Sequence, residues 1–295
     1  MDPFDPNDQD SISEYRDAMY RLRYAAWDKP LRVGQLIQLC LKQPTKSVHG
    51  RDLPKLPFGF EHEYVLRRPL QNDPVKFQPR SYVWIAVPFI PEVPGTEVVL
   101  KFIPPSHQAL PGKDIVPHRW VPPAIITQCQ AEAYERLDYL QGESIPYCFG
   151  GFEGCKDIET PWGESVYLIA MEYIPAPFVE SVDAIGDTTV FLDILQSAVT
   201  ALLSAHEKVI AHHNLDETNV RFDAFRNKVV FIGWKNDLAY NNSRSAFTSS
   251  CMDDTCRLFH LFFQYKVHRQ DMTRTIRENA CLREVFKHSW RQWEK

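Results

Sequence analysis

The sequence predicts an α+β fold in which a five-stranded antiparallel sheet, interrupted by one helix, precedes a mainly helical half. Three patterns predict it. Between 63 and 103, short apolar runs of strand length are separated by a loop rich in Pro and Gln and by a turn at "PEVPGT". The segment 124–142 is amphipathic over a helical length and ends on Gly142. From 188 onward, apolar residues recur at helical spacing on one face, namely Val190, Ile194, Ala198 and Leu202.

The N-terminal part is predicted to be an extension of the main domain. Residues 1–12 are acidic and contain proline, so we expect a disordered tail. Residues 13–42 show helical spacing, and Pro30 divides them into two helices, the second over Leu31–Lys42. Residues 44–60 are rich in proline, as in a linker. The helical extension and linker together span 13–60.

The main domain is expected to divide at about residue 174, into parts 61–174 and 175–295. In the first part, "EYVLRR", "SYVWIAVPFI" and "EVVLKFI" predict a three-stranded meander, and "SIPYCFGGFE" and "SVYLIAMEYI" predict two later strands. In the second part, "VRF" and "KVVFIGW" predict a hairpin. Two further helices are predicted in "MDDTCRLFHLFFQY" and "TIRENACLREVFKHSWRQW".

The composition argues against several classes of protein. The net charge is −5, both signs are spread along the chain, and no basic block suggests a nucleic-acid partner. The longest apolar runs have strand length, so we expect no membrane span, and the N-terminus lacks the pattern of a signal or transit peptide. The seven cysteines form no CxxC pair, as expected for reduced thiols of an intracellular protein. We therefore expect a cytoplasmic or nuclear location.

The loop "HHNLDETN" (212–219) precedes the hairpin, and "FIGWK" ends it. His212 and Asn219 fit the ends of the motif H-R-D-x-x-x-x-N, and Trp234 fits the aromatic residue of D-F-G. Together with the order of elements, these motifs resemble the protein kinase family over residues 60–265. The segment "AEAYERLDYLQGESIP" is most similar to atypical kinase-like proteins of fungi. The resemblance implies a two-lobed kinase-like fold, with an abbreviated C-lobe because only 58 residues follow Asp237.

The resemblance also implies a nucleotide site. Lys101 stands where the family's third strand carries the lysine that grips the α- and β-phosphates. Glu132 on the following helix could form an ion pair with that lysine, and Glu135 is the alternative. A hinge at "MEYI" would place Met171 at the back of the pocket and backbone groups of Glu172 and Ile174 against adenine. The nucleotide-binding residues implied are therefore Lys101, Glu132, Met171, Glu172, Ile174 and Asn219.

The positions that carry the chemistry depart from the family. Asn214 stands where the catalytic aspartate belongs, and an amide cannot take up a proton near neutral pH. Gly233 removes the principal metal ligand, and Asp216 puts a negative charge where the family has a lysine. The connection 68–81 lacks the glycines that a phosphate-wrapping loop requires. Asp237 is the remaining candidate metal ligand, if the hairpin were longer.

Two further expectations concern packing. Asp253 or Asp254 would match the buried aspartate that braces the family's catalytic loop, or would cap the next helix. The N-terminal helical extension would pack onto the abbreviated C-lobe and complete it.

We therefore expect a pseudokinase, a catalytically impaired kinase-like protein that acts by binding protein partners and holds a nucleotide weakly. No catalytic residue is expected, and no cofactor is assigned. ATP could still bind, but Mg²⁺ would find a poor set of ligands. Two alternatives stay open. One is a divergent active phosphotransferase that uses ATP, and the other is a kinase-fold interaction module with no nucleotide site.

Overall fold

A computed structural model describes residues 4–28, 30–70, 81–89, 96–112, 120–152, 165–176, 187–234 and 244–263, together with 185, 274 and 278. The chain forms two compact units, each built from separate pieces of sequence. The first comprises Met1–Pro44, Leu53–Ala131 and Tyr147–Tyr173, and the second comprises Thr45–Asp52, Glu132–Pro146 and Ile174–Lys295. Two short segments from the earlier part of the chain therefore belong with its C-terminal part.

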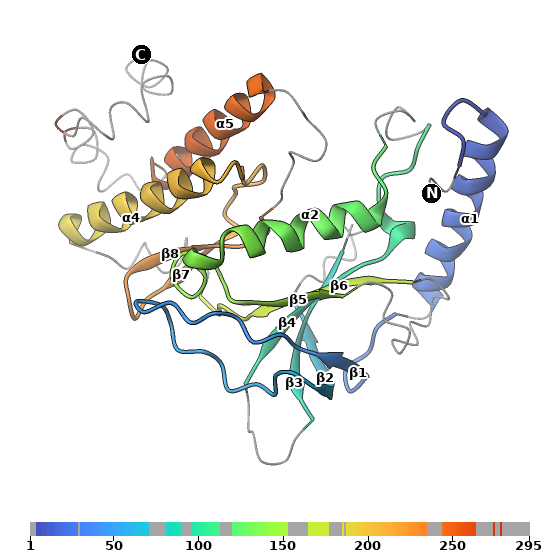
Figure 1. The fold of residues 1–295 in the computed structure, drawn as a ribbon, viewed down its shortest axis with the longest axis horizontal. Coiled ribbons are helices and arrows are strands. Elements are labelled where there is room, and N and C mark those ends of the chain that lie inside the picture. The colour runs from blue at the N-terminus through green and yellow to red at the C-terminus, as the bar shows by residue number, and fades with distance from the viewer. Residues whose placement is uncertain are drawn as a thin grey trace. The chain divides into compact units, whose positions relative to one another are not determined.

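The first unit contains a six-stranded antiparallel sheet (Figure 1). The strands are β1 (Leu36–Cys40), β2 (Glu61–Pro69), β3 (Tyr82–Pro88), β4 (Val98–Ile103), β5 (Cys148–Phe152) and β6 (Tyr167–Glu172). Their order in the sheet is β1-β2-β3-β4-β6-β5. The predicted meander is confirmed as β2, β3 and β4, and the two later predicted strands are β5 and β6.

Strand β1 corrects the sequence prediction, which placed a helix over 31–42. Ile37 and Leu39 are buried while their neighbours in the strand are exposed, so the segment has the period of two that a strand requires. Strand β1 pairs with β2, and beyond its end Lys42 N donates to Phe149 O of β5 at 2.8 Å. This bond joins the two ends of the strand order, so the sheet curls round on itself.

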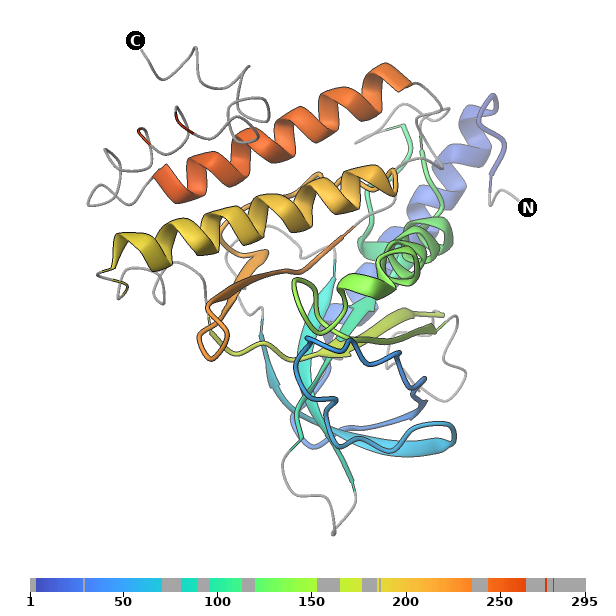
Figure 2. The same cartoon turned by 60° about the vertical axis from the view of Figure 1, so that its left-hand side comes forward.

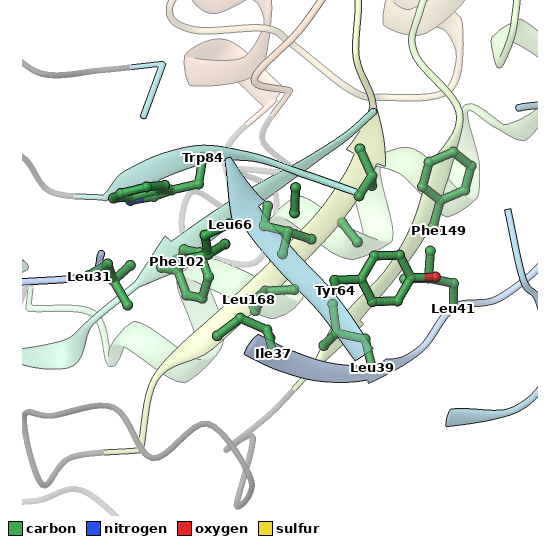
Figure 3. Packing of buried hydrophobic residues seen from close by; sticks show 14 of the residues in the cluster. Leu31, Ile37, Leu39, Leu41, Tyr64, Leu66, Trp84, Phe102, Phe149 and Leu168 are labelled. Carbon is green, nitrogen blue, oxygen red and sulfur yellow. The ribbon is translucent and has the colours of Figure 1, made fainter. Parts of the chain in front are cut away.

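The interior of the curled sheet is the main core of the first unit. Alternate side chains of β4 divide between its two faces, so Leu100 and Phe102 enter this core while Val99 and Ile103 belong to a smaller cluster on the other face. Figure 3 shows the main core, where Tyr64, Leu66 and Phe102 lie with side chains from the neighbouring strands. Leu56, in the predicted linker, also belongs to this core, so that segment is packed.

Helix α1 (Gln9–Asp28) packs within the first unit, near the short 3-10 helix η1 (Pro105–His107). Arg23 is buried and its guanidinium donates to Ser106 O at 2.7 Å and Gln108 O at 3.1 Å. The ring of Phe4 is buried and lies 5.0 Å from that of Trp120. Residues 4–12, predicted to belong to a disordered tail, thus include the buried Phe4 and the start of α1 at Gln9, and α1 belongs to the first unit together with the sheet.

A buried polar cluster adjoins η1. The ring of His107 contacts Tyr82 Oη through Nε2 at 2.7 Å and Ser106 Oγ through Nδ1 at 3.0 Å. His107 is 3% exposed, and this burial, with the nearby charge of Arg23, lowers the pKa of the imidazole to about 4. His107 is therefore neutral in the folded chain near pH 7.

Helix α2 (Pro123–Arg136) follows the sheet's fourth strand, as predicted, but ends before Gly142. Its buried polar and aromatic side chains recur at helical spacing, namely Thr127, Gln130 and Tyr134, and Leu137 continues the same stripe. The 3-10 helix η3 (Asp138–Leu140) comes next, and Gly142 adopts φ +78°, a left-handed conformation that ends the turn.

The second unit contains helices α4 (Thr188–Glu207) and α5 (Arg244–Phe263) and the hairpin of β7 (Val220–Asp223) and β8 (Lys228–Phe231). Figure 2 shows the two helices side by side. Helix α5 begins earlier than the predicted start at 252. Within the described residues, one segment, Thr189–Glu207, has the length and apolar composition of a membrane span; it also supplies buried core side chains such as Phe191 and Leu195.

Residues 45–52 form neither helix nor strand and belong to the second unit; we call them the strap. Arg51 in the strap is largely buried, and its guanidinium donates to Glu143 O at 2.9 Å and Ile145 O at 3.0 Å. On the hairpin side, Phe231 N donates to Ser144 O at 2.8 Å. The loop 142–145 is therefore held by the strap and by β8 together.

Candidate functional site

The candidate site is the loop 210–219, which links α4 to β7. After α4 ends, Ile210 N donates to Ala205 O and Val209 N donates to His206 O, the bonding pattern of a Schellman motif. Val209 takes the left-handed conformation of that motif, with φ +61°, at a place where glycine is usual. This turn directs the chain away from the helix and into the loop.

Asp254 braces the start of this loop. Its carboxylate accepts the backbone N–H of His212 at 2.5 Å and that of His213 at 2.8 Å, and it lies 3.3 Å from His206 Nε2. Asp254 is fully buried and lies ten residues after the start of α5 at Arg244, so the alternative that it caps that helix is wrong. Asp253 is exposed and pairs with Arg257 instead. The predicted brace is therefore Asp254.

His212 is a structural residue of the loop. It is fully buried, and its Nε2 donates to Ile232 O at 2.8 Å, which requires the proton on Nε2 because a carbonyl can only accept. Its ring meets that of Trp234 edge-on, with 4.8 Å between centroids. Trp234 is fully buried as well, and its indole N–H donates to Phe231 O at 3.1 Å. These bonds tie the loop to the end of the hairpin.

The amide and carboxylate of the loop bond chiefly to the loop itself. Asp216 Oδ1 accepts from Thr218 N at 2.9 Å and from Asn219 N at 3.1 Å. Asn219 Nδ2 donates to Asn214 O at 2.9 Å, and Asn214 is exposed. Asp216 thus caps a turn. The sequence predicted only that its negative charge stands where the family has a lysine, so this structural role was missed.

Gly233 lies against Asn219. Its φ is +82°, and a Cβ built at this position would stand 3.0 Å from Asn219 Oδ1. The Gly233 N–H donates to the hydroxyl of Tyr134 at 3.2 Å, and Tyr134 is buried. The space next to Gly233, where the family places its metal-binding carboxylate, is therefore bordered closely by an amide.

Lys101 has a partner that the sequence reasoning did not name. Its Nζ donates to Gln130 Oε1 on α2 at 2.9 Å, and Gln130 is 5% exposed. Glu132, two residues further along α2, is half-buried. Glu135 is exposed. The stripe of Thr127, Gln130 and Tyr134 was the sequence signal that could have identified this partner.

The predicted hinge residues lie at the end of β6. Met171 is buried on the same sheet face as Lys101, beside Val99 and Ile169. Glu172 is still part of the strand, since its N–H donates to Tyr147 O at 2.8 Å and its carboxylate accepts Tyr147 N at 3.0 Å. The backbone N–H of Glu172 is therefore already used in a hydrogen bond within the chain. Ile174, beyond the strand, is buried.

Among the residues that the structure describes, no group of three or more His, Cys, Asp or Glu side chains is arranged to hold a metal ion. Asp237, the candidate metal ligand, and most of the last predicted helix lie outside the described residues. The chemistry of the described loop is that of backbone bracing and amide hydrogen bonds.

Comparisons with known proteins find similarity among solved structures. No protein-family model matches the chain, and no curated protein matches it. Among solved structures, the chain is similar to the crystal structure of Rad53 1–466 in complex with AMP-PNP, at 17% identity and a TM-score of 0.42. The similarity covers 67% of this chain and 47% of that one, so the chain spans about half of that structure's length. At this level the likeness does not bear on the chemistry of the loop.

The class of fold follows from the elements themselves. A curled antiparallel sheet receives helix α2 between β4 and β5, and a braced loop lies between α4 and the β7–β8 hairpin. This is the order that the kinase motifs implied, so the arrangement supports a protein kinase-like fold. Strand β1 and helix α1 are additions that the resemblance did not imply.

Proposed function

We propose that this chain is a catalytically impaired, two-lobed kinase-like protein, a pseudokinase, that acts by binding a protein partner and holds a nucleotide only weakly, without a metal ion. The observation that carries the proposal is the contact between Asn219 and Gly233. A side chain at 233 would meet Asn219 Oδ1 at 3.0 Å, and the left-handed φ disfavours any side chain there. Gly233, the position that lacks the metal ligand, is thus packed tightly against Asn219.

The loss of chemistry extends to the proton acceptor. Phosphoryl transfer depends on positioning and on neutralising charge with Mg²⁺, and a carboxylate orients the attacking hydroxyl and accepts its proton. Asn214 offers an amide at that position. Each such change is expected to lower the rate of transfer by about 10²–10³.

The weak nucleotide binding in this proposal rests on one face of the sheet in the first unit. Lys101, Met171 and Val99 share one face of the sheet, as a phosphate contact and an apolar wall would. The absence of glycine from the connection 68–81 favours the second candidate, an interaction module with no nucleotide site. The intracellular location and the likeness to fungal kinase-like proteins belong to the same proposal.

Thermal unfolding of the full chain with ATP, with and without Mg²⁺, tests the nucleotide part. We expect a small rise in Tm that Mg²⁺ does not enlarge, and its loss in Lys101→Ala but not in Lys55→Ala, which removes an exposed lysine. No rise under any condition would leave the interaction module as the function.

Incubation with ATP carrying a labelled γ-phosphate tests the catalytic part. We expect no transfer to the chain or to a generic protein substrate. Transfer that depends on Mg²⁺ and disappears in Asp237→Asn would replace the pseudokinase proposal with an active phosphotransferase.

A further inference from the structure

The strap and the tip of the hairpin expose two large apolar side chains. Val48 in the strap and Phe225 between β7 and β8 are each 91% exposed, the highest values among the large hydrophobic residues that the structure describes. A single exposed hydrophobic residue is ordinary on a protein surface. Here the two most exposed ones lie in segments that bond to each other.

Arg226 makes that bond. Its Nη2 donates to Gly50 O in the strap at 3.2 Å, and its Nη1 lies 3.4 Å from Asp223 Oδ2. The same guanidinium stands over the ring of Phe225, 5.6 Å from its centroid. An arginine beside an aromatic ring is a common centre of binding energy at protein interfaces. We call Val48, Phe225 and Arg226, with the strap and hairpin residues around them, the strap–hairpin surface.

The turn itself does not require an aromatic residue. Asp223 Oδ1 accepts the backbone N–H groups of Phe225 and Arg226, both at 3.2 Å, and Asn227 supplies the left-handed residue with φ +52°. Asp223 and Asn227 therefore define the turn. Phe225 contributes a side chain that the hairpin leaves in solvent.

The surface is firmly held on its inner side. Arg51 anchors the strap to the carbonyl groups of Glu143 and Ile145, and Ser47 Oγ donates to Glu143 Oε1 at 2.5 Å. Lys228 of β8 reaches the other oxygen of Glu143 at 3.4 Å. Binding to a surface that is already ordered loses less conformational entropy than binding to a mobile loop.

The charge of this surface differs from that of the whole chain. The strap, the hairpin 220–231 and Glu143 carry five lysines and arginines against three carboxylates, whereas the chain has a net charge of −5. Lys46 is half exposed and pairs with Asp52, while Arg226 and Lys228 are about one-third exposed and pair with Asp223 and Glu143. A basic surface around an apolar centre is complementary to a segment that combines carboxylates with an apolar residue.

We propose that the strap–hairpin surface docks an acidic segment of a partner protein, with Phe225 and Val48 covering its apolar residue and Arg226 and Lys228 facing its carboxylates. This inference rests on the proposed function, because it names the chemistry of the protein partner that the proposed pseudokinase binds. Its location on the strap and hairpin is independent of whether a nucleotide binds.

Selection of a displayed random dodecapeptide library on the full-length chain, followed by fluorescence anisotropy of the selected peptides, tests the proposal. We expect selected peptides rich in Asp and Glu around an apolar residue. Their affinity should fall about tenfold or more in Phe225→Ser, as for a central interface anchor. It should also weaken as salt rises from about 50 to about 300 mM.

The matched control is Phe89→Ser, which removes another exposed phenylalanine, in the first unit. It should change the affinity by no more than about twofold, since surface substitutions away from an interface have small effects. Selected peptides without acidic enrichment, or with equal affinity for Phe225→Ser and the unmodified chain, would overturn the proposal.

Two other occupants are distinguished by the same variants. A dimer in sedimentation that dissociates in Phe225→Ser would assign the surface to a second copy of the chain and overturn the acidic partner. Binding of a labelled single-stranded RNA that competes with the peptides would assign it to nucleic acid. Phosphate transfer in the catalytic assay would contradict the pseudokinase proposal without changing these peptide affinities, so the two proposals fail separately.

Discussion

Asn219 and Gly233 are packed so closely that the second position has room for a side chain only if the first one moves. The amide oxygen of Asn219 lies 3.0 Å from the place of a Cβ at 233, and Gly233 has φ +82°. The sequence alone shows a missing carboxylate. The structure adds that the Asn219 amide and the left-handed backbone at 233 disfavour any side chain at that position.

Gly233→Ala is expected to destabilise the chain by about 1–3 kcal/mol, because alanine is strained at a positive φ and its Cβ crowds the Asn219 amide. Chemical denaturation measures the change. In an Asn219→Ala background the crowding disappears and only the backbone strain is left, so the cost of Gly233→Ala should be smaller there. An equal cost in both backgrounds would show that the Asn219 contact has no effect on stability.

Asp254→Asn is expected to cost about 2–4 kcal/mol of stability, because an amide cannot accept both backbone N–H groups that the buried carboxylate binds. The control is Asp253→Asn, the adjacent residue on the exposed face of α5, which loses only a surface ion pair with Arg257 and should cost less than about 1 kcal/mol. Comparable losses in the two variants would mean that Asp254 does not brace the loop.

Local patterns were sufficient to predict the elements whose form depends on their own sequence. Strands β3, β4 and β6 are short, nearly continuous apolar runs, and α4 has a continuous apolar face, so each could be identified without knowledge of its neighbours. The predicted loop is held together in the structure, since Asn219 donates to Asn214 O and Asp254 accepts the N–H groups of His212 and His213.

The missed features depend on contacts between distant residues. Strand β1 has five residues, too few to distinguish a strand from a helix, and it is defined by its pairing with β2. Gln130 was overlooked because the family pattern favours a glutamate, although burial along α2 places Gln130 on the inner stripe. The contact between Asn219 and Gly233 depends on how the hairpin returns to the loop, which residue spacing does not determine.

Val209→Gly is expected to stabilise the chain by about 1 kcal/mol. Valine is β-branched and strained at φ +61°, while glycine adopts this conformation at the end of a Schellman motif without steric cost. Thermal or denaturant unfolding measures the gain. Val48→Gly serves as the control, because Val48 is exposed and does not have a positive φ, so glycine there should leave stability unchanged or slightly lower. A loss of stability in Val209→Gly would show that the side-chain packing of Val209 outweighs its backbone strain.

Stability should fall as the pH drops from 6.5 to about 4 through the titration of His107. The pKa of this imidazole falls from 6.5 to about 4 on folding because the ring is buried beside Tyr82 and Ser106, with the charge of Arg23 nearby. Below pH 6.5 the unfolded chain therefore binds a proton that the folded chain excludes, so protonation favours unfolding until the folded pKa is passed. The difference corresponds to about 3 kcal/mol when the titration is complete.

Denaturation measured at several pH values, in the native chain and in His107→Gln, isolates this effect, because carboxylates that titrate in the same range contribute equally to both. The difference in stability between the two proteins should shrink as the pH falls from 6.5 to about 4, since the native chain loses what the variant never had. His49→Gln, at an exposed position in the strap, should keep the pH profile of the native chain. A constant difference across this range would show that the pKa of His107 does not change between the folded and the unfolded chain.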